Sequence, residues 1–539
     1  MKNKSKLISF IVIAALFTLS FTQSAFGNAG QESGQESEFV PLRIIGMSQG
    51  AEITWDKNSS TASAIKGKNS LKVTVGSNKA IVNGKAVILS VPIKCEYGRI
   101  TVPLHIFNNA LGTKINLEDC LKILSIKYVE FLQQENISEC IALYNKTLKG
   151  IVTPQIIKQQ AIVLKSTGSI KQESISSDRN GVHINISIKY TSPVIGQFDY
   201  IIRFDYNGFI DDFMLRPVTP SEPYMAPEYD NPDSYSEKEI VIGSGEWKLP
   251  GTLTVPKGSG PFPVVILVHG SGPNDRDETL GPLKPFRDIA AGLAAKNIAV
   301  FRYEKRSLEH NLKFGLINKV TVKEETTDDA FIAADFLAKQ KIIDPSNIFI
   351  LGHSQGGLLI PRIMTDKASN IFKGAVIMSG PSRFMGDLMV QQYEYLTNLN
   401  MATKEQSDLI KAQIDLIKSD TFSPENPPQG YAMGTPYWWA DLKAYYPTET
   451  VKKVIKPLLI LQGERDYQVT AQEDFIGWKD ELSSKENATF KLYPKLNHMY
   501  TEGEGLSTPL EYFTKANVPL YVIDDIAEWV NEAIFPDHR

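Results

Sequence analysis

Cysteine is scarce in this chain: Cys95, Cys120 and Cys140 are the only three among 539 residues. An odd number leaves at least one thiol without a partner, so a framework of disulfides cannot hold the fold together. Their spacing also matches none of the usual zinc sites. We expect buried structural thiols, in a protein large enough to be stabilised by hydrophobic cores.

An excess of positive charge is also lacking. Lys and Arg number 57 against 61 Asp and Glu, which gives a formal net charge of −4. This balance provides no basic surface for nucleic acid. The sequence contains no nucleotide-binding glycine loop, no H-E-x-x-H and no cluster of metal-ligating residues. We therefore expect no nucleic-acid partner, and chemistry without a cofactor or a metal.

The N-terminal apolar run, Leu7–Leu19, is shorter than the about 20 residues that a membrane-spanning helix needs. Its flanks, a basic start and a small-x-small site, are typical of a signal peptide over residues 1–27, with an uncleaved anchor as the alternative. We expect a secreted or cell-surface protein in which residues 28–38 form a flexible tether. The flanking residues are Lys2, Lys4 and Lys6 before the run and Ala25-Phe26-Gly27 after it.

Residues 39–117 predict a small β-rich domain. The Asn83-Gly84 pair between apolar runs marks a hairpin, and Gly112 is placed as the C-cap of a short helix. The stretches I-T-W-D at 53–56, V-N-G at 82–84 and V-P-L…A-L-G at 102–112 resemble the domain named after the N-terminal region of copper amine oxidases. The resemblance implies a spacer or a surface-attachment module, and no copper site.

Residues 118–217 predict a second small domain, helical first and stranded afterwards. Apolar residues recur at helical spacing from Leu121, and Gly181–Tyr190 and Phe198–Phe209 have the alternation of strands. This order resembles an uncharacterised α+β domain, cystatin-like or cone-like, that is found ahead of exported hydrolases. We find no chemistry in its sequence.

A proline-rich linker is expected over residues 218–236, because prolines at this density resist both helices and central strands. From 237 to 539, short apolar strands alternate with helical stretches. This pattern predicts an α/β fold with a mostly parallel sheet and helices on both faces. Reactive groups should then lie in loops at the carboxyl ends of the strands.

The stretch Ile348–Gly357 predicts a strand, a sharp turn and a helix, with Ser354 at the turn. Gly352 and Gly356 flank this serine in the pattern G-x-S-x-G. Such a strained turn leaves no room for Cβ atoms beside the serine and presents its hydroxyl at the end of the sheet. Ser354 is therefore the expected nucleophile.

Two further strand ends supply an acid and a base. Asp466 follows the strand Leu458–Leu461, and His498 follows Thr489–Tyr493. The order Ser, Asp, His is the one that α/β-hydrolases use. Of the two histidines after Ser354, the other is the penultimate residue, so His498 is the expected base. Glu464 is the competitor for the acid, and the position after the strand favours Asp466.

The glycine-rich loop 269–273 follows the strand Val264–Val268, where these enzymes place one donor of the oxyanion hole. We expect the backbone N–H of Gln355 and that of Ser271 to stabilise the oxyanion, with Gly272 as the alternative to Ser271. His353 is expected to shape the site and not to carry a proton. Gly272, His353, Trp438 and Trp439 are the residues expected to border the substrate.

Four stretches of this region are similar to bacterial carboxylesterases of the EstD type. They are H-G-S-G-P-N-D-R-D at 269–277, K-P-F-R-D-I-A at 284–290, F-R-Y-E-K-R at 301–306 and G-H-S-Q-G-G at 352–357. The resemblance covers 237–539 and implies Ser354, Asp466 and His498 as a catalytic triad, with an ester as substrate. Glu304 stands where that family has Asp, and Arg276 and Asp277 are expected to brace the oxyanion loop.

An insertion over about 381–451 separates two strands and contains the aromatic segment 431–446. At this position such hydrolases carry a lid, and an aromatic lid favours an acyl or aryl group in the pocket. A packing cap without a role in selectivity is the alternative.

These observations predict an exported serine carboxylesterase acting on a small-molecule ester, with possible cell-wall or surface association through its N-terminal domains. A serine peptidase or aminoacyl hydrolase could use the same triad. A cell-surface binding protein is the alternative from another class.

Overall fold

The computed structural model describes residues 38–96, 98–218 and 221–535. The expected signal peptide and nearly all of the tether lie outside these residues. The chain divides into two compact units, one over Ala25–Val218 and the other taking in Thr219–Arg539. No helix in the described part of the chain is long and apolar enough to cross a membrane.

The first part of the N-terminal unit is β-rich, as predicted. Five antiparallel strands follow one another in chain order, and β1, β8 and β7 form a second small sheet. Asn83 and Gly84 both have positive φ, 50° and 80°, in the turn between β5 and β6. Gly112, with φ of 63°, ends α3. The elements are β1 (Phe39–Pro41), α2 (Leu42–Ser48), β2 (Glu52–Asp56), β3 (Thr61–Lys66), β4 (Asn69–Thr74), β5 (Lys79–Val82), β6 (Lys85–Ile88), β7 (Lys94–Glu96), β8 (Arg99–Pro103) and α3 (Leu104–Leu111).

The second part of this unit is α+β. Helices come first, and a four-stranded antiparallel sheet in the order β12-β11-β10-β9 follows. All three cysteines of the chain are free thiols; Cys120 and Cys140 are buried in helices here, whereas Cys95 is exposed. Burial raises the pKa of both buried thiols to about 12, which keeps them inert. The elements are α4 (Leu117–Gln133), α5 (Ile137–Leu143), α6 (Lys146–Ile151), α7 (Pro154–Ser166), β9 (Lys171–Arg179), β10 (Ile184–Ser192), β11 (Gly196–Phe204) and β12 (Ile210–Pro217).

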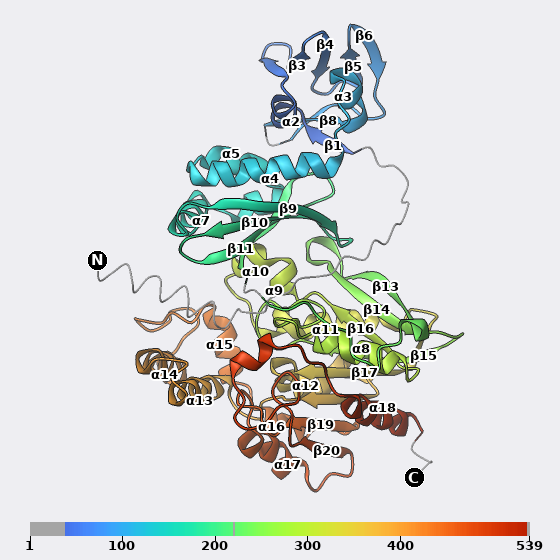
Figure 1. The fold of residues 1–539 in the computed structure, drawn as a ribbon, viewed down its shortest axis with the longest axis vertical. Coiled ribbons are helices and arrows are strands. Elements are labelled where there is room, and N and C mark those ends of the chain that lie inside the picture. Colours follow the sequence, from blue (N-terminus) through green and yellow to red (C-terminus); the bar gives the residue numbers. More distant parts are fainter. Residues whose placement is uncertain (1–37, 97, 219–220, 536–539) are drawn as a thin grey trace. The chain divides into compact units, whose positions relative to one another are not determined.

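The C-terminal unit is built on an eight-stranded sheet in the order β13-β14-β16-β15-β17-β18-β19-β20 (Figure 1). The strands from β16 through β15 to β20 are parallel neighbours, and β13 and β14 are antiparallel. This is the α/β-hydrolase arrangement that the sequence predicts. The strands are β13 (Tyr235–Ile242), β14 (Leu249–Pro256), β15 (Phe262–Val268), β16 (Ala299–Tyr303), β17 (Ile343–His353), β18 (Gly374–Met378), β19 (Leu458–Gly463) and β20 (Ala488–Tyr493).

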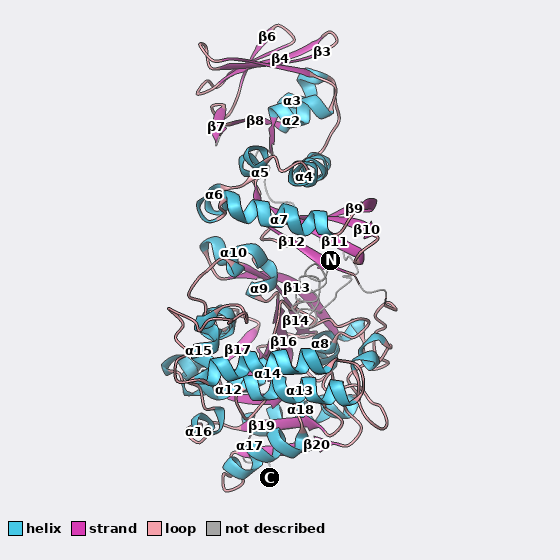
Figure 2. Ribbon diagram, turned by 90° about the vertical axis from the view of Figure 1, so that its left-hand side faces the viewer, coloured by secondary structure: helices cyan, strands magenta, loops and turns pink. Residues whose placement is uncertain are grey.

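Helices cover both faces of this sheet, as Figure 2 shows. Val264 and Ile266 of β15 pack with residues of α11, α12 and α17 in one buried cluster. Val265 and Leu267 of the same strand pack with α8 and α18 in another. Because both faces are buried, the central strands β15 and β18 are apolar at every position. The helices are α8 (Pro285–Ala294), α9 (Arg306–Glu309), α10 (Asn311–Gly315), α11 (Asp328–Leu337), α12 (Gln355–Thr365), α17 (Ile476–Leu482) and α18 (Leu520–Ile534).

The proline-rich segment packs on this unit along part of its length. The Tyr224 hydroxyl donates to Asp288 of α8 at 2.8 Å, and the Tyr229 hydroxyl donates to the carbonyl oxygen of Val518 at 2.6 Å. The strand β13 begins at Tyr235, inside the range predicted as linker. Part of the predicted linker therefore belongs to the structure of this unit.

The insertion after β18 is helical. Its first helix runs over Met385–Asn398, and the next one runs over Lys404–Lys418. Phe384, Trp438 and Trp439 join residues of both helices in one apolar cluster. The insertion therefore has a small core of its own. Its helices are α13 (Met385–Asn398), α14 (Lys404–Lys418), α15 (Pro436–Lys443) and α16 (Pro447–Val451).

Candidate active site

Ser354 lies in the one-residue turn between β17 and α12. Its backbone has φ of 52° and ψ of −117°, a combination that residues with a side chain rarely adopt. Two backbone hydrogen bonds hold it there. The Ser354 N–H donates to the carbonyl oxygen of Met378 at 3.0 Å, and the Leu358 N–H donates to the carbonyl oxygen of Ser354 at 2.9 Å. The serine is thus held in a strained geometry at the carboxyl end of the central strand.

Close backbone contacts explain both glycines of the motif. A Cβ atom on Gly352 would lie 2.3 Å from the carbonyl oxygen of Gly356. A Cβ atom on Gly356 would lie 2.3 Å from the carbonyl oxygen of Val268, at the end of β15. Any side chain at either position would push the turn away from its neighbours, so only glycine allows this packing.

Asp466 and His498 lie at the ends of β19 and β20. The His498 Nδ1 is 2.7 Å from the Asp466 Oδ2, and both side chains are buried. The Asp466 Oδ1 accepts hydrogen bonds from the backbone N–H groups of Gln468 and Val469 at 2.8 and 2.9 Å. Glu464, the other acid that the sequence left open, is exposed to solvent. The buried carboxylate beside His498 is therefore that of Asp466.

The loop after β15 is fixed by hydrogen bonds to both of the peptide groups that flank the Cα atom of Gly270. The Gly270 N–H donates to Glu278 at 2.5 Å, and the Gly270 carbonyl oxygen accepts from Lys305 Nζ at 2.7 Å and from Asn274 at 3.1 Å. A Cβ atom on Gly270 would lie 3.1 Å from the Cβ of Ser354, so this loop runs directly past the serine. Ser271, the next residue, borders the cavity described below.

A buried ion pair joins this loop to the turn. The His353 Nδ1 lies 2.8 Å from Glu278, and the His353 Nε2 lies 2.9 Å from the carbonyl oxygen of His498. Burial alone would lower the pKa of His353, but the Glu278 carboxylate outweighs it and raises this pKa. Burial alone would raise the pKa of Glu278, and the His353 charge reverses that and lowers it. The Glu278 carboxylate thus favours the protonated form of His353, and the two side chains are paired.

A second buried carboxylate, Glu325, has three partners from separate parts of the chain: a loop and two helices. Its Oε2 accepts from Gln355 Nε2 of α12 at 2.9 Å and from Trp438 Nε1 of α15 at 2.7 Å. Its Oε1 lies 3.2 Å from Nζ of Lys305, the lysine that also donates to Gly270. Lys305 is 2% exposed, so this ion pair is shielded from water.

The residues expected to brace the oxyanion loop do contact the sheet. Arg276 donates to Glu304 at 2.7 Å and to Glu239 at 2.6 Å. Asp277 accepts from Lys284 at 2.9 Å and pairs with Arg302 of β16. The loop is thus tied to β13 and β16 by paired charges.

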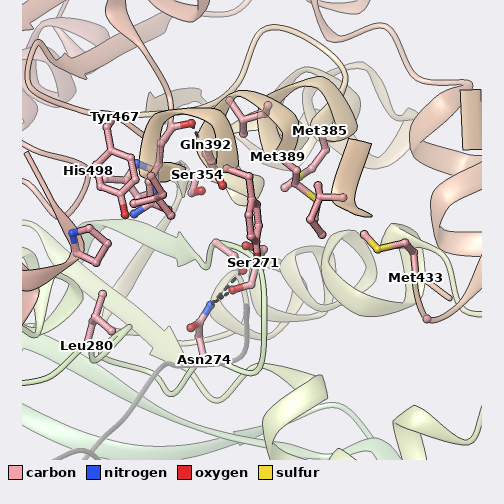
Figure 3. A pocket seen from close by; sticks show the side chains of 18 of the residues that line it. Ser271, Asn274, Leu280, Ser354, Met385, Met389, Gln392, Met433, Tyr467 and His498 are labelled. Carbon is pink, nitrogen blue, oxygen red and sulfur yellow. Dashed lines mark hydrogen bonds between the residues drawn. The ribbon is translucent and has the colours of Figure 1, made fainter. Parts of the chain in front are cut away.

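A cavity of about 740 Å³ opens at Ser354 (Figure 3). Part of its lining comes from the insertion 381–451, which is called the lid below. Ser271, Ser354 and His498 line the cavity, together with the predicted residues His353, Trp438 and Trp439. Gly272, which the sequence predicts to border the substrate, is not among the described residues that line this cavity, and neither is Gln355. Most of the remaining lining is apolar and comes from the insertion, including Met385, Met389 and Met433.

Sequence reasoning missed Glu278, Lys305 and Glu325, which hold the loop and the turn in place. Lys305 lies within the stretch F-R-Y-E-K-R that carries the family resemblance, and this was the one available signal for it. Glu325 stands in a run of charged residues that resembles the exposed face of a helix. In the structure it is buried within a π-helical turn, Lys323–Thr327, directly before α11.

Comparison with known proteins gives two matching family models. Residues 29–126 match the copper amine oxidase N-terminal domain, and residues 293–413 match the prolyl oligopeptidase family. Among curated proteins, esterase EstD of Thermotoga maritima is 34% identical over 408 residues, which is 75% of this chain and 93% of that protein. The matched length exceeds that of 237–539, so the similarity includes part of the chain ahead of the α/β domain.

Solved structures of esterases are also similar, with low identity. Est1E from Butyrivibrio proteoclasticus is 18% identical, covers 55% of this chain and 98% of its own, and has a TM-score of 0.36. The Pyrococcus furiosus esterase Pf2001 is 14% identical, covers 58% of this chain and 97% of its own, and has a TM-score of 0.37. This chain belongs to the family of esterase EstD and is a serine hydrolase of the α/β-hydrolase fold.

Proposed function

We propose that this protein is an exported carboxylesterase that works through an acyl-enzyme on Ser354, with Asp466 and His498 completing a catalytic triad. One observation carries the proposal. Ser354 is held in a strained turn at the cavity, and the same cavity is bordered by His498, whose Nδ1 lies 2.7 Å from Asp466.

The chemistry follows from these positions. Because Nδ1 of His498 is bound to Asp466, Nε2 is the nitrogen that takes the proton from the Ser354 hydroxyl. The serine oxygen bonds to the ester carbonyl carbon, and the tetrahedral intermediate then breaks its bond to the alcohol oxygen, which receives the proton from His498. A water molecule attacks the acyl-enzyme in the same way, releases the acid and returns the proton to Ser354.

The negative charge on the intermediate needs fixed donors. The backbone N–H of Gln355 is at the start of α12, and that of Ser271 follows the fixed peptide of Gly270. Each such donor is worth about 3 kcal/mol of transition-state stabilisation. Asp466 contributes by fixing the tautomer of His498 and stabilising its charged form.

The lining of the cavity favours esters over peptides. A peptidase that reads a free amine needs an unpaired carboxylate near the nucleophile. Among the described residues that line the cavity, the carboxylates are Glu278 and Glu325, and each already faces a cation, His353 or Lys305. An amide-cleaving activity is the second candidate, because residues 293–413 match the prolyl oligopeptidase family.

Export is proposed from the N-terminal sequence. The basic residues before Leu7–Leu19 and the small residues that follow it are typical of a signal peptide. We propose that the protein is secreted or held at the cell surface, with the N-terminal domains available for attachment. Fractionation of the native host, followed by N-terminal sequencing of the mature protein, tests this; a full-length cytoplasmic protein would contradict it.

The catalytic proposal is tested with the full chain and matched pairs of aryl esters and arylamides that share an acyl group. We expect ester hydrolysis at a kcat/KM at least 100-fold above that for the amide. Ser354→Ala should abolish ester turnover, whereas Ser346→Ala, at an exposed serine near the start of the same strand, should not. Faster cleavage of the amide would favour the peptidase, and ester turnover by Ser354→Ala would exclude the triad.

A further inference from the structure

We propose that Glu325 is a positioning residue that aims both oxyanion donors and seats the lid over Ser354. The inference rests on the proposed function. The Glu325 carboxylate contacts three residues whose relative positions matter for the reaction. They are Lys305, which binds the oxyanion loop, Gln355, which follows the nucleophile, and Trp438 of the lid. No other described carboxylate that lines the cavity contacts the lid.

The contact toward the loop acts through a single peptide plane. The carbonyl of Gly270 and the N–H of Ser271 belong to the same peptide, and in a trans peptide these two groups point in opposite directions. Lys305 Nζ holds the carbonyl oxygen of Gly270 at 2.7 Å. This hydrogen bond therefore keeps the Ser271 N–H pointing away from Lys305. Glu325 holds Lys305 in place at 3.2 Å.

The contact toward the nucleophile fixes the other donor. The Gln355 side chain is buried and donates to Glu325 at 2.9 Å. The backbone N–H of the same residue is the first of α12 and the other expected oxyanion donor. Tying the side chain to Glu325 limits the rotation of this residue. Both donors thus depend on the same buried carboxylate.

The contact toward the lid links substrate coverage to this network. Trp438 Nε1 donates to Glu325 at 2.7 Å from α15, and Trp438 and Glu325 both border the cavity. The π-helical turn Lys323–Thr327 places Glu325 among these partners. Such turns insert one residue into a helix and redirect its side chains, and they are frequent at functional sites.

The test compares Glu325→Gln and Lys305→Met with the wild type, using kcat per active site titrated with a fluorophosphonate. We expect kcat to fall 10- to 100-fold in both variants with KM changed less than threefold. The affinity for an alkyl trifluoromethyl ketone, which forms an oxyanion on the serine, should fall by the same factor as kcat. A purely structural role would lower the number of titrated sites and leave both quantities unchanged per site.

Lys456→Met is the matched control, because Lys456 also donates to backbone carbonyls, those of Ser369 and Phe372, away from the cavity. It should leave ketone affinity and kcat per site unchanged. If Lys305→Met does not fold, Lys305→Arg keeps the charge opposite Glu325 and moves the donor, and the same parallel loss is expected. Ketone affinity within twofold of the wild type in the folded variants overturns the inference. Esterase activity in Ser354→Ala would instead overturn the proposed function.

The cavity carries a second, independent inference about the substrate. Figure 3 shows His498 and Tyr467 on one side of Ser354, and Met385, Met389 and Met433 on the other. Separate apolar clusters stand behind the two sides: Tyr467 packs with Leu280 and Tyr512, whereas Met389 and Met433 pack with Trp439.

Because His498 protonates the departing alcohol, the alcohol belongs on the side of Tyr467. We propose that the substrate is an uncharged ester with a bulky apolar acyl group under the lid and an apolar or aromatic alcohol against Tyr467. Methionine side chains adapt to irregular shapes, so the acyl side should accept chains of several lengths. The volume of about 740 Å³ is that of a site for a drug-sized molecule.

Four esters test the assignment: methyl and naphthyl esters of acetic and octanoic acid. Met389→Trp should lower the octanoate-to-acetate ratio of kcat/KM at least 10-fold and leave the naphthyl-to-methyl ratio unchanged. Leu280→Trp should lower the naphthyl-to-methyl ratio of kcat/KM at least 10-fold and leave the octanoate-to-acetate ratio unchanged. The assignment is wrong if the two variants exchange these effects or if neither ratio changes more than twofold. Activity on the methyl acetate ester shows that the proposed function holds in either case.

Discussion

Replacing Ser354 by glycine should stabilise the protein while abolishing its activity. The backbone at this residue has φ of 52° and ψ of −117°, outside the regions open to residues with a Cβ atom. Holding a residue in such a region costs on the order of 1–3 kcal/mol. Glycine adopts it without that cost, since it has no Cβ atom.

The net gain is smaller than the strain. Glycine makes the unfolded chain more flexible, which costs about 0.5–1 kcal/mol. We therefore expect Ser354→Gly to raise the free energy of unfolding by about 1 kcal/mol. Ser354→Ala is the matched control, because it removes the same hydroxyl and keeps the Cβ atom and the strain. Its stability should stay within about 0.5 kcal/mol of the wild type.

Unfolding of the full chain in urea, followed by tryptophan fluorescence, measures this difference. Five of the six tryptophans lie in 219–539, so the signal reports mainly on the catalytic unit. The result that matters is the difference between the glycine and alanine variants, both of which should be inactive. If Ser354→Gly is no more stable than Ser354→Ala, the turn carries no strain and this reasoning fails.

Three further changes have expected outcomes. Gly356→Ala places a Cβ atom 2.3 Å from the Val268 carbonyl oxygen and should lower kcat at least about 100-fold by moving the oxyanion loop; an unchanged kcat would contradict the packing argument. Asp466→Asn should lower kcat about 10⁴-fold with the thermal midpoint nearly unchanged, because His498 would take the wrong tautomer; a loss under tenfold would leave Asp466 without this role. Burial raises the pKa of Asp288 to about 7, so this group destabilises the folded state as the pH rises from about 4 through 7, by up to about 4 kcal/mol. In urea unfolding, the free energy of unfolding of Asp288→Asn should rise relative to that of the wild type between pH 5 and pH 8. If the free energies of the two proteins change with pH in parallel, Asp288 ionises normally.

The ends of the parallel strands could be predicted because their sequence is dictated by local rules. Strands buried on both faces are apolar throughout, and the chain must turn directly after each of them. At the carboxyl ends of these strands, Val268 pairs with Gly352, and Gly463 pairs with Tyr493. Residues that follow these positions therefore meet in space although they are far apart in the chain. This is why Ser354, Asp466 and His498 could be named from the sequence.

The first strand of the catalytic unit was not predicted. Strand β13 carries Glu237, Lys238 and Glu239 at its centre and lies at the edge of the sheet. Charged side chains are common on edge strands, where they discourage pairing with other chains. Two of them pair with arginines, Glu237 with Arg302 and Glu239 with Arg276. Its sequence therefore resembles a loop more than a strand.

Buried charges were the other feature that the sequence could not supply. Glu278, Lys305 and Glu325 are ordinary surface residues by type, and nothing in their neighbours marks them as buried. Each is tolerated in the interior because a partner from a different element neutralises it. Those partners are brought together only by the tertiary fold, so a motif cannot reveal them.

The central claim is that an acyl group passes through Ser354. The most direct measurement is mass spectrometry of the peptide that contains Ser354, after acid quenching during steady-state turnover of an aryl ester. The account predicts that this peptide gains the mass of the acyl group less one hydrogen, with the modification on Ser354 and none in Ser354→Ala. Full ester turnover with the acyl group on another residue, or with no acylated peptide at any quench time, would contradict it.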